Sequence, residues 1–153
     1  MVNNKFMIKF FIVFFFFTNF FKSDFICQEN KILLLNFSNL RNNKGYIRIG
    51  IYLDENSFQN ELPFRTISFN KDKEKDGKLN AEIFINEGEY GIAVLDDENN
   101  NGKMDYKFFI PQEGYGFSNY IHSTLQKPNF IQFKFTVKKM IINEINISMK
   151  YFL

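Results

Sequence analysis

The stretch Tyr46–Leu53 reads Tyr-Ile-Arg-Ile-Gly-Ile-Tyr-Leu, with an aliphatic side chain at every second position. Successive side chains of a β-strand point to opposite faces, so this period of two indicates a strand with one buried, apolar face. Patterns of the same kind predict six further strands. These lie at 31–37, 64–69, 79–86, 89–95, 131–137 and 145–151. The charged run 71–78 contains Asp76-Gly77, which favours a solvated hairpin tip.

Together these segments predict an all-β fold. The expected architecture is a single antiparallel β-sandwich, immunoglobulin-like or prealbumin-like, with about seven strands. Residues 28–153 contain all of the predicted strands and have the length of one such domain. No internal repeat and no linker composition interrupts them, so one domain is expected.

Residues 1–27 differ in composition from the rest of the chain. Lys5 and Lys9 precede a run dominated by phenylalanine, which is shorter than the about 20 apolar residues of a membrane-spanning helix. This pattern is typical of a signal peptide, so we expect a protein that is secreted or resides in the periplasm or cell envelope. The exact cleavage site stays open. A membrane partner is expected only if this segment is retained or Cys27 is lipidated, and Ile26 is larger than lipidation normally tolerates.

Composition excludes several classes of site and partner. Basic residues of the predicted signal peptide account for much of the net charge of +2, so we do not expect nucleic acid as a partner. A single cysteine excludes an internal disulfide framework and a zinc site built from thiolates. The single histidine, His122, excludes a two-histidine metal site within one subunit, and we expect it at the surface or half-buried.

The segment Asp97–Asp105 concentrates side-chain oxygen, reading Asp-Glu-Asn-Asn-Asn-Gly-Lys-Met-Asp. Its spacing matches the first part of an EF-hand calcium loop, in which alternate residues point inward and a glycine permits the sharp turn. The sequence therefore predicts a calcium site. The expected ligands are Asp97, Asn99, Asn101, the carbonyl of Lys103 and Asp105, with Asp96 and Glu113 as possible extra ligands.

The match to a calcium loop is incomplete. Phe108 stands where an EF-hand has its bidentate glutamate, and no helix is expected to follow. We therefore expect weak binding, with a dissociation constant of about 10⁻⁴–10⁻³ M. A plain polar loop without metal is the alternative, because Asn101-Gly102 is also a strong hairpin signal and Asx turns can satisfy the loop's backbone.

Two aromatic residues follow in the run Gly114-Tyr115-Gly116-Phe117. Exposed aromatic side chains in loops often mark recognition surfaces, so Tyr115 and Phe117 form a possible binding surface for an unknown protein or a glycan. The alternative is that both rings fold over the open end of the sandwich and close it.

Several of these motifs carry a resemblance to a known family. They are Gly-x-Tyr-x-Ile-x-Val at 88–94, the run 97–105, Pro-Gln-Glu-Gly-Tyr-Gly-Phe-Ser-Asn at 111–119, and Pro-Asn-Phe at 128–130. The chain resembles, over about residues 31–151, the secreted bacterial family catalogued as domain of unknown function 2141. The resemblance implies a signal-bearing envelope or secreted protein with the sandwich fold described above, and it implies no established activity. That family often has a histidine at the position of Asp96.

Three functions are compatible with these features. The first is a secreted or envelope module that is not an enzyme, with a calcium-binding loop and an aromatic contact surface. The second is a glycan hydrolase that uses two carboxylates separated by a fixed distance across a cleft. The carboxylates available to it are Asp96, Asp97, Glu98, Asp105 and Glu113. The third is a structural or adhesion subunit without metal, which pairs through an edge strand.

Overall fold

The structure is a computed structural model that describes residues 31–124, 126–138 and 143–152. The predicted signal peptide at 1–27, including Cys27, lies outside these residues. The secondary-structure elements are β1 (Lys31–Ser38), β2 (Tyr46–Tyr52), α2 (Glu55–Gln59), β3 (Arg65–Asn70), β4 (Leu79–Ile85), β5 (Gly88–Asp97), β6 (Tyr106–Lys107), β7 (Ile110–Pro111), β8 (Gly114–Phe117), the 3-10 helix η1 (Phe130–Gln132), β9 (Lys134–Val137) and β10 (Asn143–Ser148).

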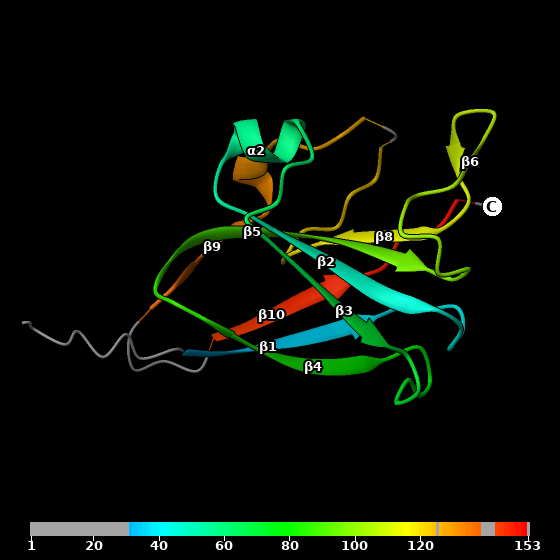
Figure 1. The fold of residues 1–153 in the computed structure, drawn as a ribbon, viewed down its shortest axis with the longest axis horizontal. Helices are drawn as coiled ribbons and strands as arrows, with labels where there is room; N and C mark the ends of the chain where they lie inside the picture. The colour runs from blue at the N-terminus through cyan, green and yellow to red at the C-terminus, as the bar shows by residue number, and fades with distance from the viewer. Residues whose placement is uncertain (1–30, 125, 139–142, 153) are drawn as a thin grey trace, which may run out of the picture.

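Two sheets form the sandwich, as predicted (Figure 1). The smaller sheet has the order β10-β1-β4, and the larger one has the order β3-β2-β5-β8, with β9 also paired to β5. One edge of β5 has two partner strands in succession. Strand β9 pairs with Gly88–Gly91, and β8 pairs with Ala93–Asp96. The pairs within both sheets are antiparallel except for β1 and β10, which run parallel.

The core between the sheets follows the alternation seen in the sequence. Ile47, Ile49 and Ile51 of β2 are completely buried, and Ile92 and Val94 of β5 lie beside them in the same cluster. The smaller sheet supplies the opposite layer. Its buried residues are Leu33, Leu35, Phe37, Leu79, Ile83, Ile85, Ile145 and Ile147. Each such side chain contributes about 1.5–3 kcal/mol when it is removed from water, so this layer dominates the stability.

Three expectations about element boundaries need correction. Leu53 is exposed because the chain leaves β2 after Tyr52 and enters α2, whose first turn is capped by the Asp54 carboxylate. The segment 131–137 is a strand only from Lys134, since the preceding residues form η1. Residues 114–117, expected as a loop, form strand β8.

A second hydrophobic cluster covers part of the outer face of the larger sheet. It consists of Tyr52, Phe58, Phe117, Phe130 and Phe133. Helix α2 and the segment around η1 lie over this face (Figure 1). Phe58 stands at the centre, with its ring 5.2 Å from that of Tyr52 and 4.7 Å from that of Phe133. Within the described part of the chain, no helix is long and apolar enough to cross a membrane.

Candidate functional site

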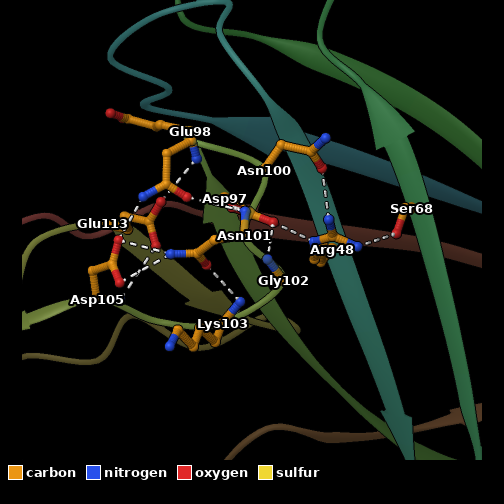
Figure 2. Close-up of polar contacts among 11 residues, drawn as sticks. Arg48, Ser68, Asp97, Glu98, Asn100, Asn101, Gly102, Lys103, Asp105 and Glu113 are labelled. Atoms are coloured by element: carbon orange, nitrogen blue, oxygen red, sulfur yellow. Dashed lines mark hydrogen bonds and ion pairs between the residues drawn. The ribbon is translucent and has the colours of Figure 1, made fainter.

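Strand β5 ends at Asp97, and the carboxylate of this residue organises the loop that follows (Figure 2). It accepts hydrogen bonds from the backbone N–H groups of Asn101, at 3.0 Å, and Gly102, at 2.9 Å. Gly102 has a φ of +82°, the left-handed conformation that glycine adopts without strain. The guanidinium of Arg48, on β2, forms an ion pair with the same carboxylate and donates to the side chain of Asn100 at 2.7 Å.

The two predicted asparagine ligands converge on Asp105. The amide nitrogen of Asn99 lies 2.5 Å from one Asp105 oxygen, and that of Asn101 lies 3.0 Å from both oxygens. The amide oxygens of these two residues accept backbone N–H groups of Asn101 and Lys103, at 3.0 and 2.9 Å, which are Asx turns. Of the predicted group, the loop brings Asn99, Asn101 and Asp105 together, whereas the Asp97 carboxylate is held by Arg48 and by backbone N–H groups. The Lys103 side chain is exposed.

The two extra candidates lie in different places. Glu113 joins the loop, because its carboxylate accepts the backbone N–H of Glu98 at 3.0 Å and that of Asp105 at 3.4 Å. Asp96 does not, because neighbouring residues of a strand face opposite sides. Its side chain points into the sandwich, where it pairs with Lys71 and accepts the Tyr151 hydroxyl at 2.6 Å.

Burial and hydrogen bonding change the proton affinity of this loop in opposite directions. Burial acts to raise the pKa of Asp97, but the hydrogen bonds from Arg48, Gly102 and Asn101 outweigh it and hold the pKa below its usual value. Burial raises the pKa of Glu113 above its usual value, and the nearby carboxylates of Asp97 and Asp105 act in the same direction. Asp97 is therefore held as an anion, whereas Glu113 takes up a proton more readily than an exposed glutamate.

A cation in this loop would depend on amide and backbone oxygens as well as carboxylates. Among the described residues, no three side chains of the histidine, cysteine, aspartate and glutamate types are grouped closely enough to hold a metal. The amide nitrogens of Asn99 and Asn101 face Asp105, because the amide oxygens accept the backbone N–H groups of the two Asx turns.

A groove opens beside the loop on the outer face of the larger sheet. Its floor is formed by two paired small residues, Gly50 of β2 and Ala93 of β5, and its volume is about 460 Å³. Arg48, Gly102 and Met104 line the end next to the Asp97–Asp105 loop. The lining also includes the aromatic residues Tyr52, Phe58, Tyr106, Phe109, Tyr115, Phe117 and Phe152, and His122. The groove has the mixture of apolar walls and few polar groups that is typical of ligand sites.

The two aromatic residues predicted as a binding surface have different environments. Phe117 is buried in the outer-face cluster, its ring 5.1 Å from that of Phe133, so it packs on a face of the larger sheet and not over the open end of the sandwich. Tyr115 is half-buried and lines the groove, with its ring stacked on Phe152 at 5.9 Å. Its hydroxyl donates to the carbonyl of Thr124 at 3.3 Å.

The expectation that His122 is at the surface or half-buried is wrong. The ring is 7% exposed, and its Nε2 donates to the carbonyl of Gln126 at 2.6 Å. Packing against Tyr115, Phe117 and Tyr120 explains the burial. The Nδ1 atom is buried without a hydrogen-bond partner.

Sequence reasoning did not identify Arg48, Gly50, Ala93 or Lys71 as residues of interest. The first two occupy the polar face of the strand Tyr46–Leu53, where Gly50 makes space for the ring of Tyr52, which a Cβ at this position would approach to 2.9 Å.

Comparison with known proteins places the chain in a family. Residues 35–143 match the family model described as an uncharacterized protein conserved in bacteria, DUF2141. The chain belongs to this family. The DUF2141 match covers β2 to β9 completely and includes the Asp97–Asp105 loop and most of the groove lining. No curated protein and no solved structure matches this DUF2141 chain.

Proposed function

We propose that this DUF2141 protein is an exported, non-catalytic module that binds a glycan in the groove and calcium in the Asp97–Asp105 loop. The observation that carries the proposal is that the loop and the groove share a wall. Arg48 pairs with Asp97 of the loop and lines the groove, and the loop residues Gly102 and Met104 line it as well. An ion that orders the loop would therefore also set the shape of the groove.

The groove chemistry supports a glycan as the ligand. Tyr115 and Tyr106 offer aromatic faces, which carry partial negative charge and suit the C–H groups of a sugar ring. Arg48, Thr66 and Gln126 add hydrogen-bonding groups around the same cavity.

Calcium binding is supported by the convergence of Asn99, Asn101 and Asp105 and by the backbone turns that hold them. The ion pair of Arg48 with Asp97 makes the expected affinity low, because a divalent cation next to a guanidinium is repelled by it. At about 1 mM calcium, a dissociation constant of about 10⁻⁴–10⁻³ M adds about 0.4–1.4 kcal/mol of stability. The role of calcium would be to order a loop.

The glycan-hydrolase alternative has less support, because its carboxylates lie outside the groove. The groove is lined by Glu61, whereas the five carboxylates considered for a glycan hydrolase are not among its lining residues. The Asp97 carboxylate is paired with Arg48, and the Glu113 carboxylate accepts the backbone N–H of Asp105. These carboxylates are therefore engaged within the loop.

Calorimetric titration of calcium into the purified protein tests the ion site. We expect saturable heat in the millimolar range and a rise in melting temperature, both lost in Asp105→Ala and retained in the control Asp76→Ala, which changes an exposed aspartate in another turn. Absence of heat and of a melting shift in the unmodified protein would leave the plain polar loop as the correct interpretation.

Nuclear magnetic resonance with a panel of neutral and N-acetylated oligosaccharides tests the groove. The amide signals of Gly50, Ala93 and Thr66 are expected to shift on binding, and Tyr115→Ala is expected to weaken binding at least tenfold while Tyr115→Phe retains most of it. Shifts confined to other surfaces would remove the groove from the proposal.

A further inference from the structure

Strands β6 and β7 form a two-residue hairpin whose tip consists of Phe108 and Phe109. The hairpin extends from the end of the molecule that carries the Asp97–Asp105 loop (Figure 1). Phe108 is 86% exposed and Phe109 is 94% exposed. Tyr106, at 65%, adds a third exposed ring at the base. Exposed apolar side chains gathered at one projecting point indicate a contact outside the chain.

The backbone of this tip is unfavourable for the residues that occupy it. Phe108 has a φ of +49° and Phe109 a φ of +67°, so both are in the left-handed region. Two-residue hairpins with positive φ at both central positions strongly prefer Asn-Gly, because a bulky side chain is strained there. Strain of this kind persists at sites that serve a function. The folding of the hairpin alone would favour other residues.

The charged side chain within the hairpin is basic, and a second lysine lies in the loop before it. Lys103 and Lys107 are exposed, and within the described residues neither side chain takes part in an ion pair. The hairpin itself, 106–111, contains no acidic residue. The acidic residues Asp105 and Glu113 flank the hairpin in the sequence, and their carboxylates accept hydrogen bonds within the Asp97–Asp105 loop. The tip is therefore an aromatic point with basic side chains behind it.

We propose that the hairpin tip docks on a lipid bilayer that contains anionic lipids. Phe108 and Phe109 enter the boundary between the headgroups and the acyl chains, where aromatic side chains concentrate. Lys103 and Lys107 lie at the level of the anionic headgroups. A protein partner is a poorer match, because a stable protein interface needs about 800 Å² per partner, and two projecting rings supply a narrow point.

The chain contains no tryptophan, so a tryptophan placed at the tip is a unique reporter of its surroundings. The full chain with Phe109→Trp is mixed with vesicles of phosphatidylcholine alone or with phosphatidylglycerol. We expect a blue shift of the emission and quenching by brominated lipids, both stronger with phosphatidylglycerol. Phe84→Trp is the matched control, because Phe84 is an exposed residue of β4 on the other sheet and its emission should not change. Phe109 also lines the groove, so Phe108→Trp, at a position that does not line it, is measured in parallel and should give the same shift and quenching.

A second variant separates docking from folding. Phe108→Asn/Phe109→Gly installs the residues that the turn prefers, so it should fold with equal or higher melting temperature while its affinity for phosphatidylglycerol vesicles falls at least tenfold. Phe84→Asn should leave that affinity unchanged. An emission maximum at position 109 that stays that of water-exposed tryptophan with both vesicle types, or equal vesicle affinity for the Asn-Gly variant, would overturn the proposal and leave a protein contact as the explanation of the tip.

Discussion

Lys71 and Asp96 form an ion pair in which both side chains are completely shielded from solvent. The Tyr151 hydroxyl donates to the second oxygen of Asp96, at 2.6 Å, so the carboxylate is satisfied on both sides. Burial raises the pKa of Asp96 even though Lys71 and Tyr151 donate to it. Breaking one member of such a pair leaves the other charge buried without compensation.

We therefore predict that Lys71→Met lowers the free energy of unfolding by about 3–5 kcal/mol. Urea denaturation measures this loss. The double variant Lys71→Met/Asp96→Leu removes both charges and should recover most of it. A single variant that loses less than about 1 kcal/mol, the value of an exposed pair, would show that the pair is hydrated in solution.

Acid should destabilise the protein partly through Asp97. The pKa of this residue is lower in the folded chain than in the unfolded one, so its contribution to stability is complete above about pH 4–5 and is lost as the pH falls through the folded-state pKa. We predict that the free energy of unfolding of Asp97→Asn depends less steeply on pH between about 2 and 4. Asp72→Asn, an exposed control, should keep the steep dependence. Parallel curves for the two variants would contradict the assignment.

Glycine is required in β8 because another side chain occupies the space. A Cβ atom at Gly114 would lie 2.3 Å from the ring of Tyr151, which is held by Asp96. We predict that Gly114→Ala loses about 1–3 kcal/mol through overpacking. Gly102→Ala is the comparison: its Cβ would meet open space, apart from Arg48 at 4.0 Å, so only the strain of the positive φ of about 1 kcal/mol applies. Thermal unfolding of both variants ranks the two costs, and the opposite ranking would contradict this packing.

The cluster on the outer face should contribute as much per residue as the main core. Phe58 is 2% exposed and contacts the rings of Tyr52, Phe117 and Phe133. We predict that Phe58→Ala costs about 3–5 kcal/mol. Phe64→Ala, at a residue 62% exposed, should change stability by less than about 0.5 kcal/mol. Chemical denaturation distinguishes the two, and a small effect at Phe58 would mean that α2 is held only loosely.

Regular alternation made most of the sandwich predictable. The isoleucines of β2 and the inward residues of β4 and β5 could be assigned because each strand has one apolar face. Strand β8 could not be predicted, because its inward positions are Gly114 and Gly116, which have no apolar side chain. The side chains of Tyr151 and Ile147 occupy the space next to these glycines. The parallel pairing of β1 with β10 also has no local signal, since it joins distant segments.

The candidate site was predictable in part for a similar reason. Oxygen-bearing residues within one short loop are necessarily close in space, so their spacing in the sequence predicted the grouping of Asn99 and Asn101 around Asp105. The inward direction of Asp96 was implied by the alternation through Ile92 and Val94, but its partner Lys71 belongs to a charged run that was expected to be solvated. The Asp76-Gly77 turn of that run does form, with positive φ at both residues. The burial of Lys71, at the start of this run, depends on its contact with Asp96 of β5, which is distant in the sequence.

The parallel neighbour of β1 has a further consequence for how the chain reaches its final shape. Asn36 on β1 and Asn146 on β10 are 110 positions apart, and the small sheet is incomplete until both are present. During synthesis from the amino end, the edge of β1 that pairs with β10 therefore has no partner strand until nearly the whole sequence has been made. The domain matures only after the ribosome has delivered β10, and shortening the chain before this strand would leave an edge open to association with other molecules.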